Sequence, residues 1–272
     1  MPTSQQRGKL IIIGGAEDRY DDCLILREFL RCAGGVKARI AILTAATGEP
    51  REAGETYIEL FERLGVEHVT VVDTRDRNDG ETVDALDAIA NATGVFFTGG
   101  DQARIIDTIK DTLLEDILHK RHNEGMVIAG TSAGAAAIPE AMIVEGDSQT
   151  HARLDAVEMG PGLGFLSGIV VDQHFAQRGR LGRLLAATLQ CSSALGFGID
   201  EDTAIVVDGN EARVIGSGAV TIVDEAETTY SNLDTILKDE AFAVCGVKLH
   251  VLPAGHTFDL ATRQRVESEG PR

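Results

Sequence analysis

The chain has 272 residues, which is enough for one large domain or two smaller ones with a substantial buried core. Its formal net charge is −18 at pH 7, from 43 acidic and 25 basic residues. A field of this sign repels phosphates and anionic lipid headgroups, so the composition argues against nucleic acid or a membrane surface as a partner.

Short apolar runs alternate with longer amphipathic segments through the first half of the chain. The runs predict strands at 10–13, 39–43, 68–72, 94–97 and 126–129, and the segments between them predict helices near 23–32, 53–64, 83–90 and 103–121. This alternation is typical of a parallel sheet covered by helices on both faces. We therefore expect a doubly wound α/β fold.

The second half of the chain predicts one more strand and helix, followed by hairpins. A strand at 169–171 and a helix at 182–190 precede strands at 204–207, 213–215 and 220–223, which are separated by glycine-containing turns. The runs 248–252 and 256–260 predict a last hairpin. Repeats, low-complexity segments and linkers are missing from the sequence, so we expect a single α/β domain over 1–272 with a flexible tail at 1–8.

The segment Gly130-Thr131-Ser132-Ala133-Gly134 has the pattern G-x-S-x-G between an apolar strand and an alanine-rich helix start. A sharp strand-to-helix turn lifts a serine hydroxyl clear of the sheet, and small flanking residues let the backbone bend. The turn also aims the N–H of Ala133 and the helix dipole at a developing oxyanion. An ordinary glycine-rich turn is the alternative, but the strand context favours Ser132 as a nucleophile.

Three glycine-rich loops follow predicted strands, where ligands bind in open α/β sheets: 14–19, 98–102 and the serine turn. The first loop lacks the G-x-G-x-x-G spacing, and Glu17 and Asp18 would face a nucleotide's phosphates. We therefore expect no cofactor. No H-E-x-x-H motif or Cys/His cluster occurs, so no metal is expected, and His119 and His122 are predicted on a solvated helix face.

His174 is the candidate base, because it follows the apolar strand 169–171 and lies beside the presumed site. A buried, hydrogen-bonded histidine is the alternative. A carboxylate must then fix the imidazole tautomer, and Asp200, Glu201 and Asp202 stand at another predicted strand end. Strand alternation puts Glu201 on one face and the two aspartates on the other, but it does not say which face meets His174.

Arg178, Arg180 and Arg183 are predicted to enter the helix that follows His174. Exposed cations in a first helical turn each cost about 0.3–1 kcal/mol, so three of them suggest a carboxylate receptor. Pairing with the protein's own acids is the alternative, and it stays open. Four further residues could complete a polar pocket, with the acids available to a substrate cation: Asp101, Gln102, Asp172 and Gln173.

The cysteines predict an intracellular setting. All four stand outside any C-x-x-C motif, no apolar leader precedes the first strand, and no run is long enough to span a bilayer. We therefore expect free thiols and a cytoplasmic protein.

Several blocks of the chain together resemble the cyanophycinases, serine-type exopeptidases related to the peptidase E group. The most discriminating block is Asp172-Gln173-His174-Phe175 with the three arginines that follow it. The resemblance runs through nearly the full length, in the segments 13–18, 97–102, 130–135, 172–183 and 198–201.

The resemblance implies a triad of Ser132, His174 and Glu201. In the mechanism that we expect from it, the N–H of Ala133 and one from Gly99 or Gly100 stabilise the oxyanion. It implies a substrate pocket that includes Gln102, Asp172, Gln173, Arg178, Arg180 and Arg183, and it implies a homodimer. The substrate would be cyanophycin, a poly-aspartate backbone with arginine on each β-carboxyl, and the product the β-Asp-Arg dipeptide.

Three other functions remain possible from the sequence. A peptidase E-like dipeptidase would act on small Asp-X substrates. An esterase would use the order serine, acid, late histidine, with Asp224 and His250 or His256. A binding module would grip an Arg- and Asp-rich polymer without cutting it.

Overall fold

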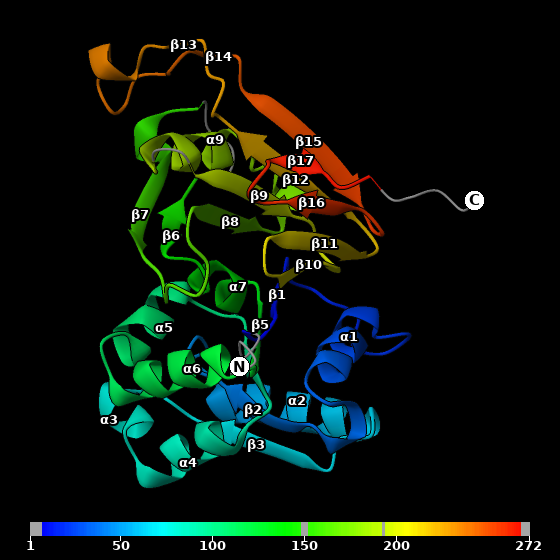
Figure 1. Ribbon diagram of the computed structural model, residues 1–272. Helices are drawn as coiled ribbons and strands as arrows, with labels where there is room; N and C mark the ends of the chain where they lie inside the picture. Colours follow the sequence, from blue (N-terminus) through cyan, green and yellow to red (C-terminus); the bar gives the residue numbers. More distant parts are fainter. Residues whose placement is uncertain (1–6, 148–151, 192–193, 268–272) are drawn as a thin grey trace, which may run out of the picture.

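The computed structural model describes residues 7–147, 152–191 and 194–267 (Figure 1). Leaving aside three short 3-10 turns, the elements in chain order are β1 (Leu10–Ile13), α1 (Leu24–Cys32), β2 (Arg39–Leu43), α2 (Pro50–Arg63), β3 (His68–Val72), α3 (Arg77–Gly80), α4 (Val83–Asn91), β4 (Gly94–Phe97), α5 (Gln102–Ile109), α6 (Leu113–Asn123), β5 (Val127–Thr131), α7 (Ala133–Ala137), β6 (Ala141–Gly146), β7 (Val157–Pro161), β8 (Ile169–Gln173), α8 (Phe175–Arg178), α9 (Leu181–Gln190), β9 (Leu195–Ile199), β10 (Thr203–Asp208), β11 (Glu211–Gly216), β12 (Ala219–Asp224), β13 (Tyr230–Ser231), β14 (Val244–Cys245), β15 (Lys248–Pro253), β16 (Thr257–Asp259) and β17 (Gln264–Arg265).

A nine-stranded sheet forms the centre of the molecule, in the order β17-β16-β11-β10-β1-β5-β4-β2-β3. The five strands from β1 to β3 in this order run parallel, and β10, β11, β16 and β17 continue the sheet in antiparallel fashion. The predicted α/β fold with a mostly parallel sheet and antiparallel C-terminal strands is confirmed.

Helices cover both faces of the four inner parallel strands, β1, β5, β4 and β2, which are buried almost throughout, whereas the edge strand β3 is half-exposed. Ile11 and Ile13 of β1 pack on one face with α1 and α2, whereas Leu10 and Ile12 pack on the other with α4, α5 and α6. Figure 1 shows α1 and α2 on one side of these strands and α4 to α6 on the other. The even burial explains why the strands appear in the sequence as continuous apolar runs rather than alternating ones.

A second sheet, in the order β15-β12-β9-β8, packs against the first and was not predicted. Only β8 and β9 in it are parallel. Its inward residues Phe197 and Ile222 belong to the same buried cluster as Ile12 and Ile205 of the central sheet. The two sheets therefore share one continuous hydrophobic core.

The predicted last hairpin is wrong. β15 pairs with β12 in the second sheet, while β16 pairs with β11 in the central sheet, so the turn between them crosses from one sheet to the other. The apolar pattern identifies each strand but carries no information about its partner. The antiparallel pair of β6 and β7 was also not anticipated.

One predicted helix differs from the expectation. The segment 103–121 is two helices, α5 and α6, because Asp111 adopts a left-handed conformation (φ 57°) and the Thr112 hydroxyl caps the second helix by accepting from the N–H of Glu115. Leucine-rich periodicity runs across the break and hides it.

Near the amino terminus, two residues of the predicted tail are held by the body of the protein. The Arg7 guanidinium donates to the carbonyl of Phe165, and the N–H of Gly8 donates to the carbonyl of His122. Residues 1–6 of that tail lie outside the described residues. None of the helices in 7–147, 152–191 and 194–267 combines the length and apolar character needed to cross a bilayer.

Candidate active site

Ser132 lies in the sharp turn between β5 and α7, with φ 51° and ψ −110°. A non-glycine residue in this region costs about 1–3 kcal/mol, so other contacts must hold it. The Ser132 N–H donates to the carbonyl of Ile13 (3.1 Å), and its own carbonyl accepts from the N–H of Ala136 (3.0 Å). A Cβ on Gly130 would lie 2.5 Å from the backbone of Gly134, so these glycines let the turn close.

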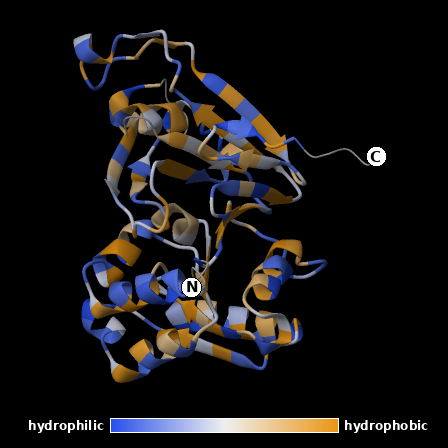
Figure 2. Cartoon of the chain, in the orientation of Figure 1, coloured by the Kyte–Doolittle hydropathy of each residue, from blue (hydrophilic) through white to orange (hydrophobic). Residues whose placement is uncertain are grey.

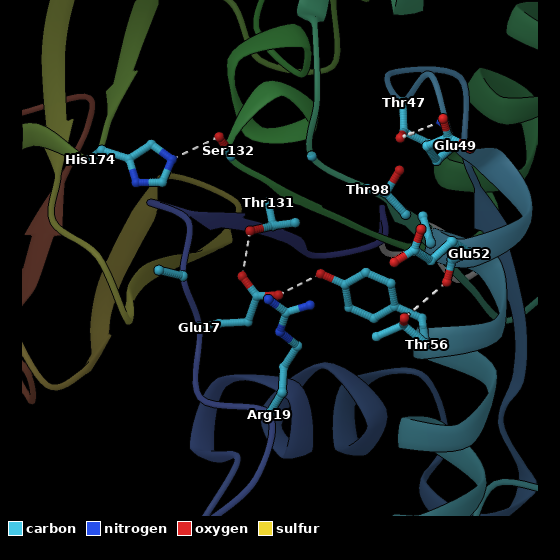
Figure 3. A pocket seen from close by; sticks show the side chains of 14 residues that line it. Glu17, Arg19, Thr47, Glu49, Glu52, Thr56, Thr98, Thr131, Ser132 and His174 are labelled. Atoms are coloured by element: carbon cyan, nitrogen blue, oxygen red, sulfur yellow. Dashed lines mark hydrogen bonds between the residues drawn. The ribbon is translucent and has the colours of Figure 1, made fainter.

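His174 directly follows β8, in a left-handed conformation with φ 49°. Its N–H donates to the carbonyl of Gly14 at 2.8 Å. Its ring packs on Gly15 so closely that a Cβ there would lie 2.4 Å from the imidazole Cε1. The Nε2 atom is 2.9 Å from Ser132 Oγ, the contact drawn in Figure 3.

Glu201 completes this line, because its Oε1 lies 2.7 Å from His174 Nδ1. An ionised carboxylate only accepts, so Nδ1 carries the proton and Nε2 offers its lone pair to the serine hydroxyl. Asp200 instead accepts from the N–H groups of Ala176 and Ala219, and Asp202 accepts from that of Asp18. β9 ends before these acids, so strand alternation did not apply to them.

A cavity of about 430 Å³ opens beside Ser132 and His174 (Figure 3). Its wall combines residues from the loops after β1, β2, β4 and β5 with the first half of α2. The lining residues are Ala16, Glu17, Arg19, Thr47, Glu49, Glu52, Ala53, Thr56, Tyr57, Thr98, Gly99, Thr131, Ser132 and His174.

Glu17 is a buried carboxylate in this wall that sequence reasoning missed as a site residue. The Tyr57 hydroxyl donates to its Oε1 and the Thr131 hydroxyl to its Oε2, both at 2.5 Å. Burial raises the pKa of Tyr57 well above its usual value, and the charge of Glu17 raises it further. An acidic pair inside a glycine-rich loop at a strand end was the available signal, but it was used only to exclude phosphate binding.

The loop that carries Glu17 is itself well anchored. The Asp18 carboxylate accepts from the N–H groups of Tyr20, Asp21 and Cys23. These backbone bonds stabilise the charged form and lower the pKa of Asp18 to about 2.

Of the three predicted oxyanion-hole residues, Ala133 and Gly99 adjoin Ser132. Ala133 begins α7, so its N–H has no carbonyl four residues earlier within the helix. Gly99 lines the cavity, and a Cβ there would lie 3.5 Å from Ser132 Cβ, whereas Gly100 packs against the carbonyl of Ala46. α7 has only five residues, so its dipole is small and the N–H group itself matters more.

Asp172, Arg180 and Arg183 form a buried ionic cluster. Asp172 is fully buried, and Arg180 (3.0 Å) and Arg183 (2.8 Å) both contact its Oδ1. Arg183 also donates to Oδ2, and Arg180 donates to the carbonyl and side chain of Gln173. Burial lowers the pKa of Arg180 and Asp172 partly offsets this. These side chains therefore contact each other, and none of the four lines the 430 Å³ cavity.

The three remaining predicted pocket residues lie at the start of α5 and the end of α8. Asp101 caps α5 by accepting from the N–H of Ala103, and the Gln102 amide donates to the carbonyls of Ile143 and Val144. Arg178 is exposed and ends α8. The arginines do not share one first helical turn, because Gly179 separates α8 from α9 and only Arg183 lies in the first turn of α9.

The expectation of a solvated face for the α6 histidines is wrong. His119 stacks on the Phe165 ring with centroids 4.2 Å apart, and His122 is buried and contacts the carbonyl of Met126. Burial lowers the pKa of His122 to about 4. Across the parts of the chain that the structure describes, no three His, Cys, Asp or Glu side chains are arranged to hold a metal ion.

The chain matches a known peptidase family over most of its length. Residues 10–215 match peptidase family S51. The chain belongs to this family. As an S51 peptidase, it is 39% identical over 260 residues to the cyanophycinase of Geminocystis herdmanii, covering 95% of this chain and 96% of that one. It is 40% identical over 256 residues to the cyanophycinase of Trichormus variabilis, covering 93% and 86%.

Solved structures share the fold of this S51 peptidase. A peptidase from an acI-B1 actinobacterium superposes with a TM-score of 0.67 at 21% identity, covering 94% of this chain and 98% of that one. A putative peptidase E protein from Listeria monocytogenes superposes with a TM-score of 0.55 at 14% identity, covering 77% and 98%.

Proposed function

We propose that this chain is a serine exopeptidase that hydrolyses cyanophycin, a poly-aspartate backbone carrying arginine, to β-Asp-Arg dipeptides. The observation that carries the proposal is the continuous hydrogen-bonded line from Ser132 Oγ through the His174 ring to Glu201. Membership in family S51 and the similarity to two proteins named cyanophycinase support the substrate.

In the first half of the proposed reaction, Ser132 Oγ attacks the carbonyl carbon of an Asp–Asp backbone amide. His174 Nε2 takes the hydroxyl proton as the C–O bond forms, and Glu201 stabilises the imidazolium through Nδ1–H. The N–H of Ala133, with that of Gly99 or Gly100, stabilises the oxyanion. His174 then gives the proton to the leaving amide nitrogen as the C–N bond breaks, and an acyl-enzyme remains.

Water completes the cycle by the reverse path. His174 takes a proton from the water as its oxygen attacks the acyl carbonyl, and returns that proton to Ser132 Oγ as the ester bond breaks. The enzyme is regenerated and the substrate chain gains a carboxyl. The proposed chemistry uses side chains, backbone N–H groups and water, and no cofactor is part of the proposal.

Substrate binding remains a proposal for the predicted pocket residues. The exposed Arg178 is suited to contact a substrate carboxylate directly. The mutual pairing of Asp172, Arg180 and Arg183 supports a role in fixing the segment after His174. Asp101 and Gln102 follow the loop that carries Gly99 and Gly100, so they adjoin the same end of the sheet.

The decisive experiment incubates the purified protein with insoluble cyanophycin and identifies the soluble product by mass spectrometry. We expect β-Asp-Arg from the parent protein, and a kcat at least about 10⁴-fold lower for Ser132→Ala because the acyl-enzyme cannot form. The control is His256→Ala, which removes the histidine that an esterase arrangement would use and should leave kcat unchanged. Release of β-Asp-Arg by Ser132→Ala near the parental rate would falsify the scheme.

Comparing insoluble cyanophycin with small Asp-X dipeptides as substrates distinguishes the proposed function from the dipeptidase alternative. A peptidase E-like enzyme would hydrolyse small Asp-X dipeptides and leave the polymer intact. The likeness to the Listeria protein is one of fold at 14% identity, so it does not favour that substrate.

Three finer statements belong to the same proposal. We propose that residues 1–272 act as one α/β hydrolytic unit, because Ser132 follows a strand of one sheet and His174 and Glu201 follow strands of the other.

We propose a homodimer, for which the exposed apolar residues Leu249 and Val251 on the edge strand β15 offer a surface. We also propose a cytoplasmic location, which cell fractionation tests.

A further inference from the structure

Arg19 lies in the wall of the same cavity as Ser132 and His174. Its guanidinium carbon is 5.8 Å from the centre of the Tyr57 ring, within the range of a cation–π contact. Figure 3 shows the side chain pointing toward Glu17. The backbone is also held, because the Arg63 guanidinium donates to the carbonyl of Arg19.

The N–H groups of this guanidinium are available to a ligand. Within the described residues, the Arg19 side chain forms no salt bridge and donates no hydrogen bond. Each oxygen of the nearby Glu17 already accepts from a hydroxyl, of Tyr57 or of Thr131. By contrast, Arg180 and Arg183 use their donors on Asp172.

Arg19 is linked to the nucleophile through a short series of contacts. It stacks on Tyr57, whose hydroxyl donates to Glu17, and Glu17 also accepts from Thr131, the residue before Ser132. A cation fixed in this way loses little conformational freedom when a ligand binds, which favours affinity and a defined pose.

The remaining charges of the cavity define what Arg19 can bind. Glu49 and Glu52, on the α2 side, repel an anion, so among the described lining residues Arg19 is the cation that can receive one. A planar guanidinium binds a carboxylate through two parallel hydrogen bonds. The proposed substrate has two kinds of free carboxylate: the α-carboxylate at the end of the backbone, and the α-carboxylate of each arginine.

We propose that Arg19 binds a carboxylate of the substrate next to the scissile bond and is a specificity-determining residue. The proposal rests on the function proposed above. A charge contact of this kind gives an exopeptidase a means to place the last unit of a chain over Ser132. The shared chemistry is a carboxylate, and substrates blocked at one carboxylate or the other separate the two sources.

The test uses a soluble oligomer of three β-Asp-Arg units in three forms: free, amidated at the backbone terminus, and amidated at the arginine carboxyls. We expect Arg19→Gln to lower kcat/KM on the free oligomer about 10- to 100-fold, mainly through KM, because it loses a charge-assisted pair. The matched control is Arg51→Gln, which removes the same charge from an exposed position on α2 and should change kcat/KM less than about twofold.

The blocked substrates identify the carboxylate. If the difference between parent and Arg19→Gln disappears on the terminal amide, Arg19 binds the chain end; if it disappears on the arginine amides, Arg19 binds the arginine carboxylate. Either result supports the proposal. An equal effect of Arg19→Gln on all three substrates, or no effect on any, overturns it.

A binding measurement keeps the result independent of turnover. Calorimetric titration of the free oligomer into Ser132→Ala and into Ser132→Ala/Arg19→Gln should give an affinity at least about tenfold weaker for the double variant. Equal affinities overturn the role of Arg19. If the parent protein binds the oligomer but releases no dipeptide, the proposed function fails while the role of Arg19 is still decided by the titration.

Discussion

At the scale of single residues, the site depends on two adjacent carbonyls at the end of β1. Ile13 accepts from the N–H of Ser132, and Gly14 accepts from that of His174. Both donor residues have a positive backbone φ, 51° and 49°, which residues other than glycine rarely adopt. One strand end therefore fixes the proposed nucleophile and the proposed base relative to each other.

The contact of Gly15 with the imidazole yields a prediction. Gly15→Ala places a Cβ where the His174 ring now lies, at a residue with φ 95°, and should displace the ring from Ser132. We expect kcat to fall about 100-fold or more, since a shift of about 1 Å costs that much. Steady-state kinetics with cyanophycin measures it.

Gly209→Ala is the matched control for this prediction. Gly209 also has a positive φ, 58°, but a Cβ there meets open space. The substitution should cost about 1 kcal/mol of stability and leave kcat unchanged. Equal losses of kcat in both variants would mean that backbone strain, and not the contact with His174, explains the effect.

Sequence reasoning reached some of these residues and not others. The pattern around Ser132 and the strand end before His174 are local, so they could be found in the chain itself. The choice of Glu201 over Asp200 and Asp202 depends on which carboxylate contacts the His174 ring, which follows another strand. Only the resemblance to the cyanophycinases indicated that choice. Glu17 accepts a hydrogen bond from Tyr57, which is 40 residues away in the sequence, and no local pattern reveals such a pair.

At the scale of elements, the Asp172 cluster joins the end of β8 to α9. Asp172 is the last but one residue of β8, and Arg183 lies in the first turn of α9. The fully buried carboxylate of Asp172 contacts both cations in the interior. The helix start tolerates Arg183 because its charge faces Asp172 and not the solvent.

Removing that carboxylate should destabilise the protein. Asp172→Ala removes the carboxylate that both buried guanidiniums contact, and we expect the free energy of unfolding to fall by about 3–5 kcal/mol. Urea denaturation followed by circular dichroism measures the change. Glu55→Ala is the control, because its salt bridge with Arg51 is exposed and worth less than about 1 kcal/mol. A loss for Asp172→Ala as small as the control's would show that the cluster adds little stability.

Most elements were predictable from the sequence, because fully buried strands are continuous apolar runs. The failures share one cause. β8, β9, β12 and β15 were found as strands, but their grouping into a separate sheet depends on long-range pairing that periodicity does not encode. The division between α5 and α6 depends on the conformation of Asp111, which lies inside an otherwise periodic segment.

At the scale of the whole molecule, β15 is an edge strand with an exposed apolar face. Leu249 is 53% and Val251 63% exposed, and Figure 2 shows hydrophobic and hydrophilic bands along this strand. Among the described strands β15 pairs only with β12. An unprotected edge of this kind is a template for a second copy.

The proposed homodimer therefore has a specific test. Light scattering during gel filtration should give a mass twice the 29.0 kDa of the chain. Val251→Lys should lower the measured mass to that of the monomer, because a charge on the edge strand opposes pairing with a second copy. Val83→Lys, at a similarly exposed apolar residue on α4, should leave the dimer intact. A monomeric parent protein contradicts the proposal.

The division of the proposed catalytic groups between two sheets has a consequence for the enzyme's robustness. Ser132 follows a strand of the larger sheet, while His174 and Glu201 follow neighbouring strands of the smaller one. The proposed triad is therefore brought together by the packing of the two sheets and not by any single sequence motif. The rate of turnover therefore depends on the relative position of the two sheets. A small displacement of one sheet against the other would abolish activity even if every strand kept its structure.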